Sequence, residues 1–349
     1  MVLLVTTALF SSVYAQEDSV AITISAVGDI MPSTSFPSKT YLVNGNRLFE
    51  QSERFLKTTD LTFGNLEGCY LDDGPVVKKC KDTTQCYAFR TPESYFKYLV
   101  DAGFNMTSIA NNHVFDFGLK GVKKTVLLAD EANIAIAGAT IRPYDIITKN
   151  DLKIGLCAFS PNKGTLNIND YDLVQTTIRN LKAQCDIVVV SFHGGAEGKN
   201  YQHVTREQEE FCGENRGNVH EFARIAIDAG GDVIIGHGPH VLRAIDIYKN
   251  RIIFYSLGNF CTPVRMNLQG VNGFAVIAQC RLTRTGEFID GELVSFIQEK
   301  GTGPIYDEGK QAIRKIKELT EKDIPEAELE ITNEGLIKRK EICHTKNLK

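Results

Sequence analysis

Short runs of β-branched and other apolar residues alternate with longer helical patterns from Ala21 to Gly236. The strand candidates are Ala21–Val27, Leu61–Leu66, Asn105–Ala110, Lys153–Phe159, Ile187–Phe192 and Val233–Gly236. The helix candidates are Asn46–Lys57, Pro92–Ala102, Leu119–Ala132, Tyr171–Gln184 and Asn218–Ala229. Strands that alternate with helices of this length predict an α/β layer fold.

The pattern changes to hairpins after Val241. The strand candidates there are Arg243–Tyr248, Ile252–Tyr255, Phe274–Leu282 and Phe288–Phe296. Lys249-Asn250 and Thr285-Gly286 are the turns between them, so we expect the sheet to be mixed or antiparallel in this part. The stretch 301–349 is charge-rich and is broken by Pro325. We interpret it as a solvated helical cap, not as a separate domain.

An apolar run at the start of the chain, Met1–Ala15, ends in Val13-Tyr14-Ala15 and is followed by polar residues. This pattern predicts a signal peptide cut after Ala15, and therefore an exported, periplasmic, cell-envelope or extracellular protein. No Lys or Arg precedes the run, so an uncleaved anchor is the alternative. The run is shorter than the roughly 20 residues that a span needs. No later segment approaches a membrane span, and we expect none in the mature chain.

Charge and cysteine content narrow the classes of protein further. The chain of 349 residues has 39 Lys and Arg against 43 Asp and Glu, so a net charge of −4 gives no general attraction for nucleic acid. Its 9 cysteines suit an oxidising compartment, and their odd number leaves at least one unpaired. We predict a local disulfide between Cys80 and Cys86. The chain contains no CxxC pair, so the spacing of its cysteines does not predict a zinc site.

Polar residues cluster where five of the predicted strands end. The motifs are Gly28-Asp29-Ile30-Met31, Gly64-Asn65-Leu66-Glu67, Asn111-Asn112-His113 with Asp116, His193-Gly194-Gly195-Ala196-Glu197 and Gly236-His237-Gly238-Pro239-His240. Each motif alone is weak, because such an Asp is often a helix cap and a buried His is often a hydrogen-bonded core residue. Together they supply the carboxylate, amide and imidazole ligands of a divalent metal site, with Asp29 and Glu67 offsetting the repulsion of two cations.

These motifs, together with Tyr255-Ser256-Leu257-Gly258-Asn259-Phe260, resemble the bacterial CapA/PgsA capsule-synthesis family, which is involved in poly-γ-glutamate biosynthesis and is related to calcineurin-like metallophosphoesterases. The likeness extends from about Ala21 to Gln298 and keeps the order of all six motifs. It implies a metallophosphoesterase-like domain over residues 20–300, an α-β-β-α sandwich of four layers with two mixed sheets. It also implies two divalent ions, Mn, Zn or Fe, at the strand ends.

The resemblance also implies roles for individual residues. The implied metal ligands are Asp29, Asn65, Glu67, Asn112, His193, His237 and His240. The implied proton donor is His113, oriented by Asp116. Weaker candidates for substrate binding are Glu197, Asn259 and Arg243, and Arg216 and Arg265 share the same chemistry. His203, His220 and His344 are interpreted as surface or structural residues.

Two motifs depart from ordinary metallophosphoesterases. This chain has Asp29-Ile30-Met31 in place of D-x-H, and it has Gly64-Asn65 followed by Glu67 in place of G-D. One imidazole and one carboxylate are therefore changed, so we expect a weaker or differently shaped first metal site. Glu197 either restores a carboxylate or orients His193 from outside the ligand set.

Two functions remain open on this basis. The first is an exported metal-dependent hydrolase or transferase that acts on an acidic cell-envelope polymer or a phosphoester, with His113 donating a proton. The second is a non-catalytic accessory protein that binds the growing acidic polymer within a capsule synthesis complex and contacts synthase subunits. A proton donor oriented by Asp116 has little use in a pure binder, which favours the enzyme.

Overall fold

The computed structural model describes residues 19–79 and 86–340. The predicted signal peptide and Cys80 lie outside the described residues, while Cys86 is disulfide-bonded. None of the helices in the described ranges is both long enough and apolar enough to cross a membrane.

The first sheet contains ten strands among the described residues, in the main order β20-β21-β18-β17-β1-β2-β5-β6. Its strands are β1 (Ile22–Ile30), β2 (Leu61–Leu66), β5 (Met106–Ser108), β6 (Ala135–Ala137), β16 (Asn259–Cys261), β17 (Phe274–Leu282), β18 (Phe288–Ile297), β19 (Ile305–Tyr306), β20 (Leu329–Ile331) and β21 (Leu336–Arg339). Strand β1 pairs parallel with β2 and antiparallel with β17, so the sheet is mixed.

The second sheet contains seven strands in the same described part of the chain, in the main order β14-β15-β13-β10-β8-β7. They are β7 (Tyr144–Lys149), β8 (Leu152–Ser160), β9 (Leu166–Asn167), β10 (Ile187–His193), β13 (Val233–His237), β14 (Ile245–Tyr248) and β15 (Arg251–Phe254). Within this sheet β8, β10, β13 and β15 pair in parallel, whereas β7 and β14 are antiparallel strands at its two edges. Separate pairs are formed by β3 (Cys69–Tyr70) with β4 (Arg90–Thr91) and by β11 (Glu209–Phe211) with β12 (Glu214–Gly217).

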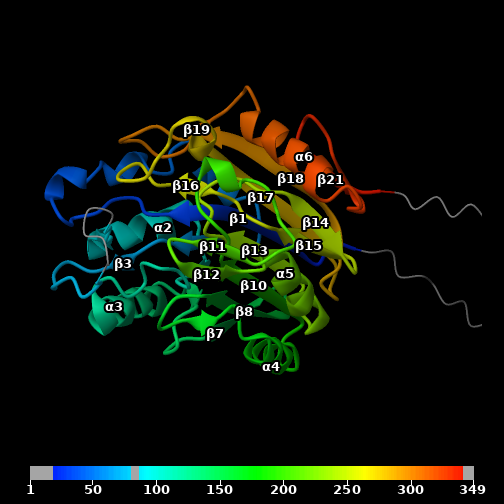
Figure 1. The fold of residues 1–349 in the computed structure, drawn as a ribbon, viewed down its shortest axis with the longest axis horizontal. Helices are drawn as coiled ribbons and strands as arrows, with labels where there is room; N and C mark the ends of the chain where they lie inside the picture. The colour runs from blue at the N-terminus through cyan, green and yellow to red at the C-terminus, as the bar shows by residue number, and fades with distance from the viewer. Residues whose placement is uncertain (1–18, 80–85, 341–349) are drawn as a thin grey trace, which may run out of the picture.

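Helices cover the outer faces of the two sheets: α1 (Glu53–Leu56), α2 (Phe96–Ala102), α3 (Gly118–Glu131), α4 (Tyr171–Lys182) and α5 (Val219–Asp228). A further helix, α6 (Gln311–Asp323), packs against β14, β17 and β18. Side chains from α1, α2 and α3 share a core with β2, β6 and β17, whereas α4 and α5 contact β8, β10 and β13 (Figure 1). A second core, which includes Ile24 and Val189, joins the two sheets. The predicted sandwich of four layers is therefore confirmed.

Both helices of the second sheet begin at side chains that cap them. Asp170 accepts a hydrogen bond from the backbone N–H of Leu173 at the start of α4, and Asn218 accepts one from Glu221 at the start of α5. Such caps contribute about 1 kcal/mol each. The caps set the residue at which each helix begins, and so they also fix where the connections that follow β9 and β12 end. Each helix then buries one apolar face.

The C-terminal segment differs from the predicted helical cap. Among its described residues, 301–340, only α6 is helical, and the face of α6 with Ile313 and Ile316 is buried in the core between the sheets. Strands β20 and β21 instead extend the first sheet, with β21 antiparallel to β18. The expectation of a wholly helical, solvated segment was wrong, because the short alternation Leu329-Glu330-Ile331 buries every second side chain. Figure 1 shows α6 beside β18 and β21.

Candidate metal centre

The polar motifs meet where strands of both sheets end. Parallel pairing of β1 with β2 sets Asp29 beside Asn65, and parallel pairing of β10 with β13 sets His193 beside His237. Gly28 lets β1 pass close to the backbone just before β16, because a Cβ on residue 28 would lie 2.0 Å from the carbonyl oxygen of Gly258. The carboxyl ends of these strands therefore bring their side chains into one place, as open α/β sheets generally do.

Glu67, His193 and His240 form a potential metal-binding triad. Their ligand atoms all lie within 4.8 Å of one another. Glu67 Oε1 is 3.5 Å from His193 Nε2 and 4.0 Å from His240 Nε2. Burial opposes ionisation of Glu67, but attraction to His193 outweighs it and lowers the pKa of Glu67 to about 2. An ionised carboxylate next to two imidazoles is a donor set suited to a divalent cation.

Asp29 adjoins this triad. Its Oδ2 lies 2.8 Å from His240 Nδ1, and its Oδ1 lies 3.3 Å from His237 Nδ1. Burial opposes ionisation of Asp29, but the adjacent imidazoles of His237 and His240 hold its pKa well below the usual range. His240 has φ of 55°, a left-handed conformation that costs a non-glycine residue of order 1 kcal/mol or more. The fold therefore retains a strained backbone where it presents this imidazole to Asp29.

Asn65 links the two carboxylates of the site. Its Nδ2 donates to Asp29 Oδ1 and to Glu67 Oε2, both at 2.8 Å, while its Oδ1 accepts from Asn111 Nδ2 at 3.1 Å. The amide nitrogen therefore faces the carboxylates, because two buried anions require donors between them. In this arrangement Asn65 orients Asp29 and Glu67, and its role as a metal ligand stays a prediction. Sequence reasoning gave Asn111 no role, although it lies in the polar run before His113.

Several buried polar atoms around this site make no hydrogen bond within the described part of the chain. They are Glu67 Oε1, Asn112 Oδ1, Asn259 Oδ1 and both ring nitrogens of His193 and of His237. A buried polar atom without a partner costs about 1–3 kcal/mol, so such a cluster is rare unless a ligand satisfies it. Carboxylate oxygens with imidazole nitrogens suit Mn, Zn or Fe, and the residues present therefore fit divalent cations.

Divalent cations should stabilise the folded protein for the same reason. At about a hundred times the dissociation constant, Mn²⁺ or Zn²⁺ is expected to raise the free energy of unfolding by about 2.7 kcal/mol. Urea unfolding with and without EDTA measures this difference, and Mg²⁺, which prefers all-oxygen sites, is the control cation. Equal unfolding midpoints with Mn²⁺, with Zn²⁺ and with EDTA would contradict the metal site.

His113 lies beside the metal centre in a second polar cluster. Its Nδ1 is 2.6 Å from Asp116 Oδ2, which also accepts the backbone N–H of Phe89 at 2.9 Å. The backbone N–H of His113 donates to Asn111 Oδ1 at 3.0 Å, and Asn111 contacts Asn65. Because Nδ1 is committed to Asp116, Nε2 is the nitrogen available for proton transfer.

Lys78 belongs to this cluster and was not identified from the sequence. Its Nζ lies 3.0 Å from Asp116 Oδ1 and 3.2 Å from His113 Nδ1. It comes from the long connection between β3 and β4, whose Val77 and Lys78 both donate backbone N–H groups to the carbonyl of Asp116. Nothing in the local sequence sets Lys78 apart from Lys79, so only the three-dimensional contact identifies it.

The three weaker candidates for substrate binding have different surroundings. Glu197 is partly exposed and binds Arg216 at 2.9 Å. Asn259 pairs with Asp29 across neighbouring strands and donates to the carbonyl of His240 at 3.2 Å, so it lies at the centre of the site. Arg243 is fully buried, and Glu209 and two backbone carbonyls occupy its guanidinium. The structure therefore corrects the prediction for Arg243, which supports the loop after His193.

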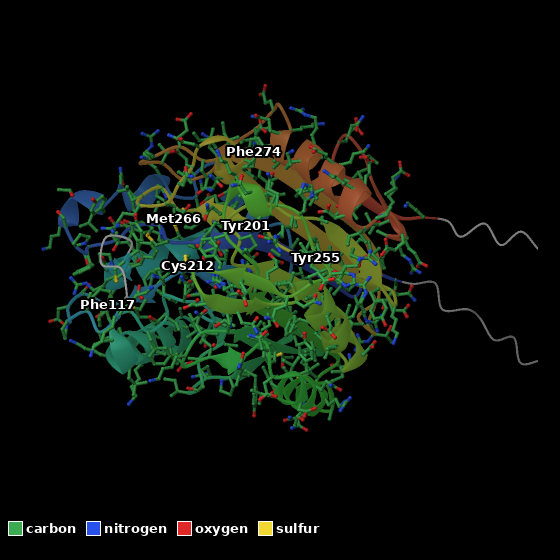
Figure 2. All side chains as sticks on the ribbon, viewed as in Figure 1. Phe117, Tyr201, Cys212, Tyr255, Met266 and Phe274 are labelled. Carbon is green, nitrogen blue, oxygen red and sulfur yellow. The ribbon has the colours of Figure 1, made fainter. Side chains whose placement is uncertain are left out.

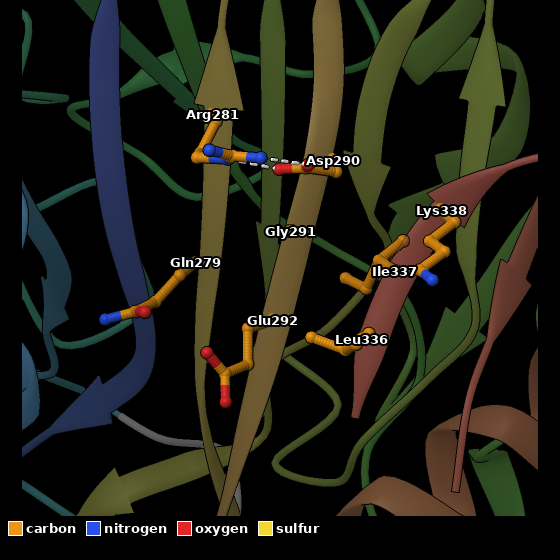
Figure 3. A pocket seen from close by; sticks show the side chains of 8 residues that line it. All are labelled: Gln279, Arg281, Asp290, Gly291, Glu292, Leu336, Ile337 and Lys338. Atoms are coloured by element: carbon orange, nitrogen blue, oxygen red, sulfur yellow. Dashed lines mark hydrogen bonds and ion pairs between the residues drawn. The ribbon is translucent and has the colours of Figure 1, made fainter. Parts of the chain in front are cut away.

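The surface of the described chain is hollowed at a cleft of about 670 Å³, whose lining includes Glu197, Tyr201 and Asn272. The carbonyl of Asn272 accepts a hydrogen bond from Asn259 of the site. A smaller hollow of about 270 Å³ lies over β17, β18 and β21, with the Arg281–Asp290 ion pair beside it (Figure 3). Arg281 pairs with Thr23 at the opposite end of β1 from Asp29. The smaller hollow is therefore remote from the metal centre.

Comparisons with known proteins identify relatives of this chain. The family model described as bacterial capsule synthesis protein PGA_cap matches residues 23–263. The capsule biosynthesis protein CapA of Bacillus anthracis is 30% identical over 259 residues, which is 68% of this chain and 59% of that protein. The PGA biosynthesis protein CapA of Bacillus subtilis is 30% identical over 254 residues, which is 68% of this chain and 62% of that protein.

The chain spans about three fifths of the length of these curated relatives. Among solved structures, a putative 5'-nucleotidase from Staphylococcus aureus in complex with α-ketoglutarate matches with a TM-score of 0.45 and 18% identity. That match covers 85% of this chain and 58% of the other.

Proposed function

This chain belongs to the bacterial capsule synthesis protein family, and we propose that it is a metal-dependent hydrolase or transferase that acts on an acidic cell-envelope polymer or phosphoester. Membership confirms the resemblance seen in the six motifs. The proposal rests on one observation: the buried, unpartnered ligand atoms of Glu67, His193 and His237 lie in the same site as an oriented imidazole, His113.

Each residue has a distinct part in this proposal. Glu67, His193 and His240 would hold one divalent ion, and Asp29 and His237, with Asn112, would hold a second. Bound cations supply Lewis-acid stabilisation of the negative charge that develops on a phosphoryl or acyl oxygen. Asn65 keeps the two carboxylates in register, and Asp116 fixes the ring of His113 so that Nε2 can donate a proton to the leaving group.

Replacing His113 by Gln separates chemistry from metal binding. We expect turnover to fall by about 10²–10⁴-fold, because general acid catalysis contributes that much, while the bound metal per chain stays unchanged. The measurement pairs elemental analysis of the purified variant with initial rates. Asn112 precedes His113, so loss of metal as well as activity would show that the substitution disturbed the ligands and would contradict this division of roles.

The substrate panel decides between enzyme and binder. The manganese-loaded full chain is incubated with a γ-linked glutamate polymer, peptidoglycan fragments and bis(4-nitrophenyl) phosphate. Turnover of any of them supports the enzyme, and the class of substrate cleaved identifies the bond type. A metal-loaded protein that binds the glutamate polymer and turns over none of the three would instead support the accessory protein of polymer synthesis.

The cellular setting belongs to the same proposal. The apolar run Met1–Ala15 and the family both favour a location in the cell envelope, where synthase subunits and the acidic polymer would be partners. Protease treatment of intact cells that express the chain tests this expectation. Degradation of the chain while the inner membrane stays intact supports export. Full protection of the chain from the protease would contradict export.

A further inference from the structure

Two buried arginines flank the turn that follows His193. The backbone N–H of Gly195 donates to the carbonyl of Arg216 at 2.9 Å. A Cβ on Gly195 would lie only 2.8 Å from Arg243 Nη1, and Gly195 has φ of 82°. The side chains of Arg216 and Arg243 are 2% and 0% exposed. Both guanidinium groups therefore need anions within the protein.

Arg243 has all the partners it needs. Its two terminal nitrogens bind the two carboxylate oxygens of Glu209 at 2.8 and 2.7 Å, and its Nε donates to the carbonyl of Tyr201 at 2.9 Å. The side chain of Glu209 is only 7% exposed. This buried pair, with the two carbonyls, engages all three nitrogens of the Arg243 guanidinium.

Arg216 is paired quite differently. One terminal nitrogen binds Glu197 Oε1 at 2.9 Å, and the other reaches Glu214 Oε2 at 3.4 Å. These carboxylate side chains are 22% and 54% exposed, so solvent reaches both. The Nε of Arg216 has no hydrogen-bond partner among the described residues. A buried guanidinium is thus neutralised by carboxylates that can move away from it.

The position of Arg216 connects it with the metal centre. Its carbonyl accepts the backbone N–H of Gly195, two residues after His193. Glu197 and Asn272 both line the 670 Å³ cleft. Asn272 accepts a hydrogen bond from Asn259, the strand neighbour of Asp29. Two lining residues of the cleft therefore contact Arg216 and Asn259, which are themselves linked to the metal centre.

We propose that Arg216 is the anion-binding residue of this site and that Glu197 is an internal substitute for a substrate anion. On this view, an anionic group that enters through the cleft displaces the carboxylate of Glu197 and binds the guanidinium of Arg216. Arg binds carboxylate or phosphate through paired N–H groups, so either group is chemically suitable. The inference rests on the proposed function, which supplies the acidic substrate.

Amide side chains dominate the rest of the cleft. Asn200, Gln202, Asn267, Gln269 and Asn272 are all in its lining, and Lys199 is the cation there. Asn and Gln both donate and accept hydrogen bonds, so they suit the uncharged part of a polymer. Tyr201, labelled in Figure 2, comes from the same loop as Glu197. Arg216 is not itself in this lining, so on this proposal an anion reaches it only by displacing Glu197.

Glu197→Gln tests the displacement, because it weakens the internal competitor and leaves Arg216 in place. Calorimetric titration of the manganese-loaded full chain with γ-linked triglutamate, and separately with inorganic phosphate, measures anion affinity. If Glu197 occupies Arg216 most of the time, the substitution should tighten binding of the matching anion roughly 5- to 10-fold. Arg216→Lys, which loses the paired donors, should weaken the same binding at least about tenfold.

Two controls make the outcome decisive. Glu210→Gln removes an equally acidic, exposed side chain on the neighbouring strand β11 and should leave both affinities unchanged. Tighter binding of triglutamate assigns a carboxylate to Arg216, and tighter binding of phosphate alone assigns a phosphoryl group. Unchanged or weaker binding of both by Glu197→Gln overturns the inference. Manganese binding is measured first, and a wild-type chain that binds no manganese contradicts the proposed function itself.

Discussion

Glu67→Gln is expected to lower the affinity for Mn²⁺ or Zn²⁺ by more than about a hundredfold, since loss of a residue that only supports a ligand already costs about 10- to 100-fold. Gln keeps the shape of Glu67 and can still accept the hydrogen bond from Asn65. It removes the negative charge that faces His193 and His240. The ligand is thus changed with little disturbance of packing. Competition with a chromophoric chelator measures the affinity.

The control for Glu67→Gln is the same substitution at Glu292, which lies in the remote hollow over β18 (Figure 3). That variant should bind metal as the wild type does. His193→Ala should reproduce the loss, because it removes a second member of the triad. If Glu67→Gln retained wild-type affinity while folded, the triad would not be the metal site.

The strand ends of the metal centre could be predicted from sequence because each motif directly follows an apolar run. Parallel pairing of β1 with β2 sets Asp29 beside Asn65, and parallel pairing of β10 with β13 in the other sheet sets His193 beside His237; packing of the two sheets then brings these strand ends together. The direction in which an amide faces is not encoded locally. From the sequence, Asn65 is predicted to be a metal ligand. Only its contacts with two carboxylates show that its amide nitrogen donates hydrogen bonds to them.

Residues that arrive from distant loops were missed or ranked low for a related reason. Lys78, which reaches Asp116 from a connection that has no periodic pattern, was not predicted, and Arg216, from the short pair β11–β12 inside a polar stretch, was predicted only as a weak anion-binding candidate. Strands as short as β20 carry too few alternations to stand out against a charged composition. Arg243 was predicted as a weak substrate-binding residue because its partner, Glu209, lies 34 positions earlier in the chain and no local pattern joins the two.

Arg243→Met is expected to destabilise the fold by about 3–5 kcal/mol, the usual cost of removing one partner of a buried ion pair. The substitution preserves much of the side-chain volume but leaves the carboxylate of Glu209 buried without its cation. It also frees the carbonyls of Ala196 and Tyr201 in the loop after His193. Urea unfolding measures the change in the free energy of unfolding.

Arg281→Met is the matched control, because its partner Asp290 lies in a solvent-exposed pair on the far side of the first sheet (Figure 3). Exposed pairs contribute about 0–1 kcal/mol, so that variant should unfold nearly as the wild type does. In Arg243→Met combined with Glu209→Gln, the uncompensated charge is gone, and the loss should be smaller than the sum of the single losses. Purely additive losses would mean that the two side chains stabilise the loop separately, and the interpretation of Arg243 as half of a structural ion pair would be wrong.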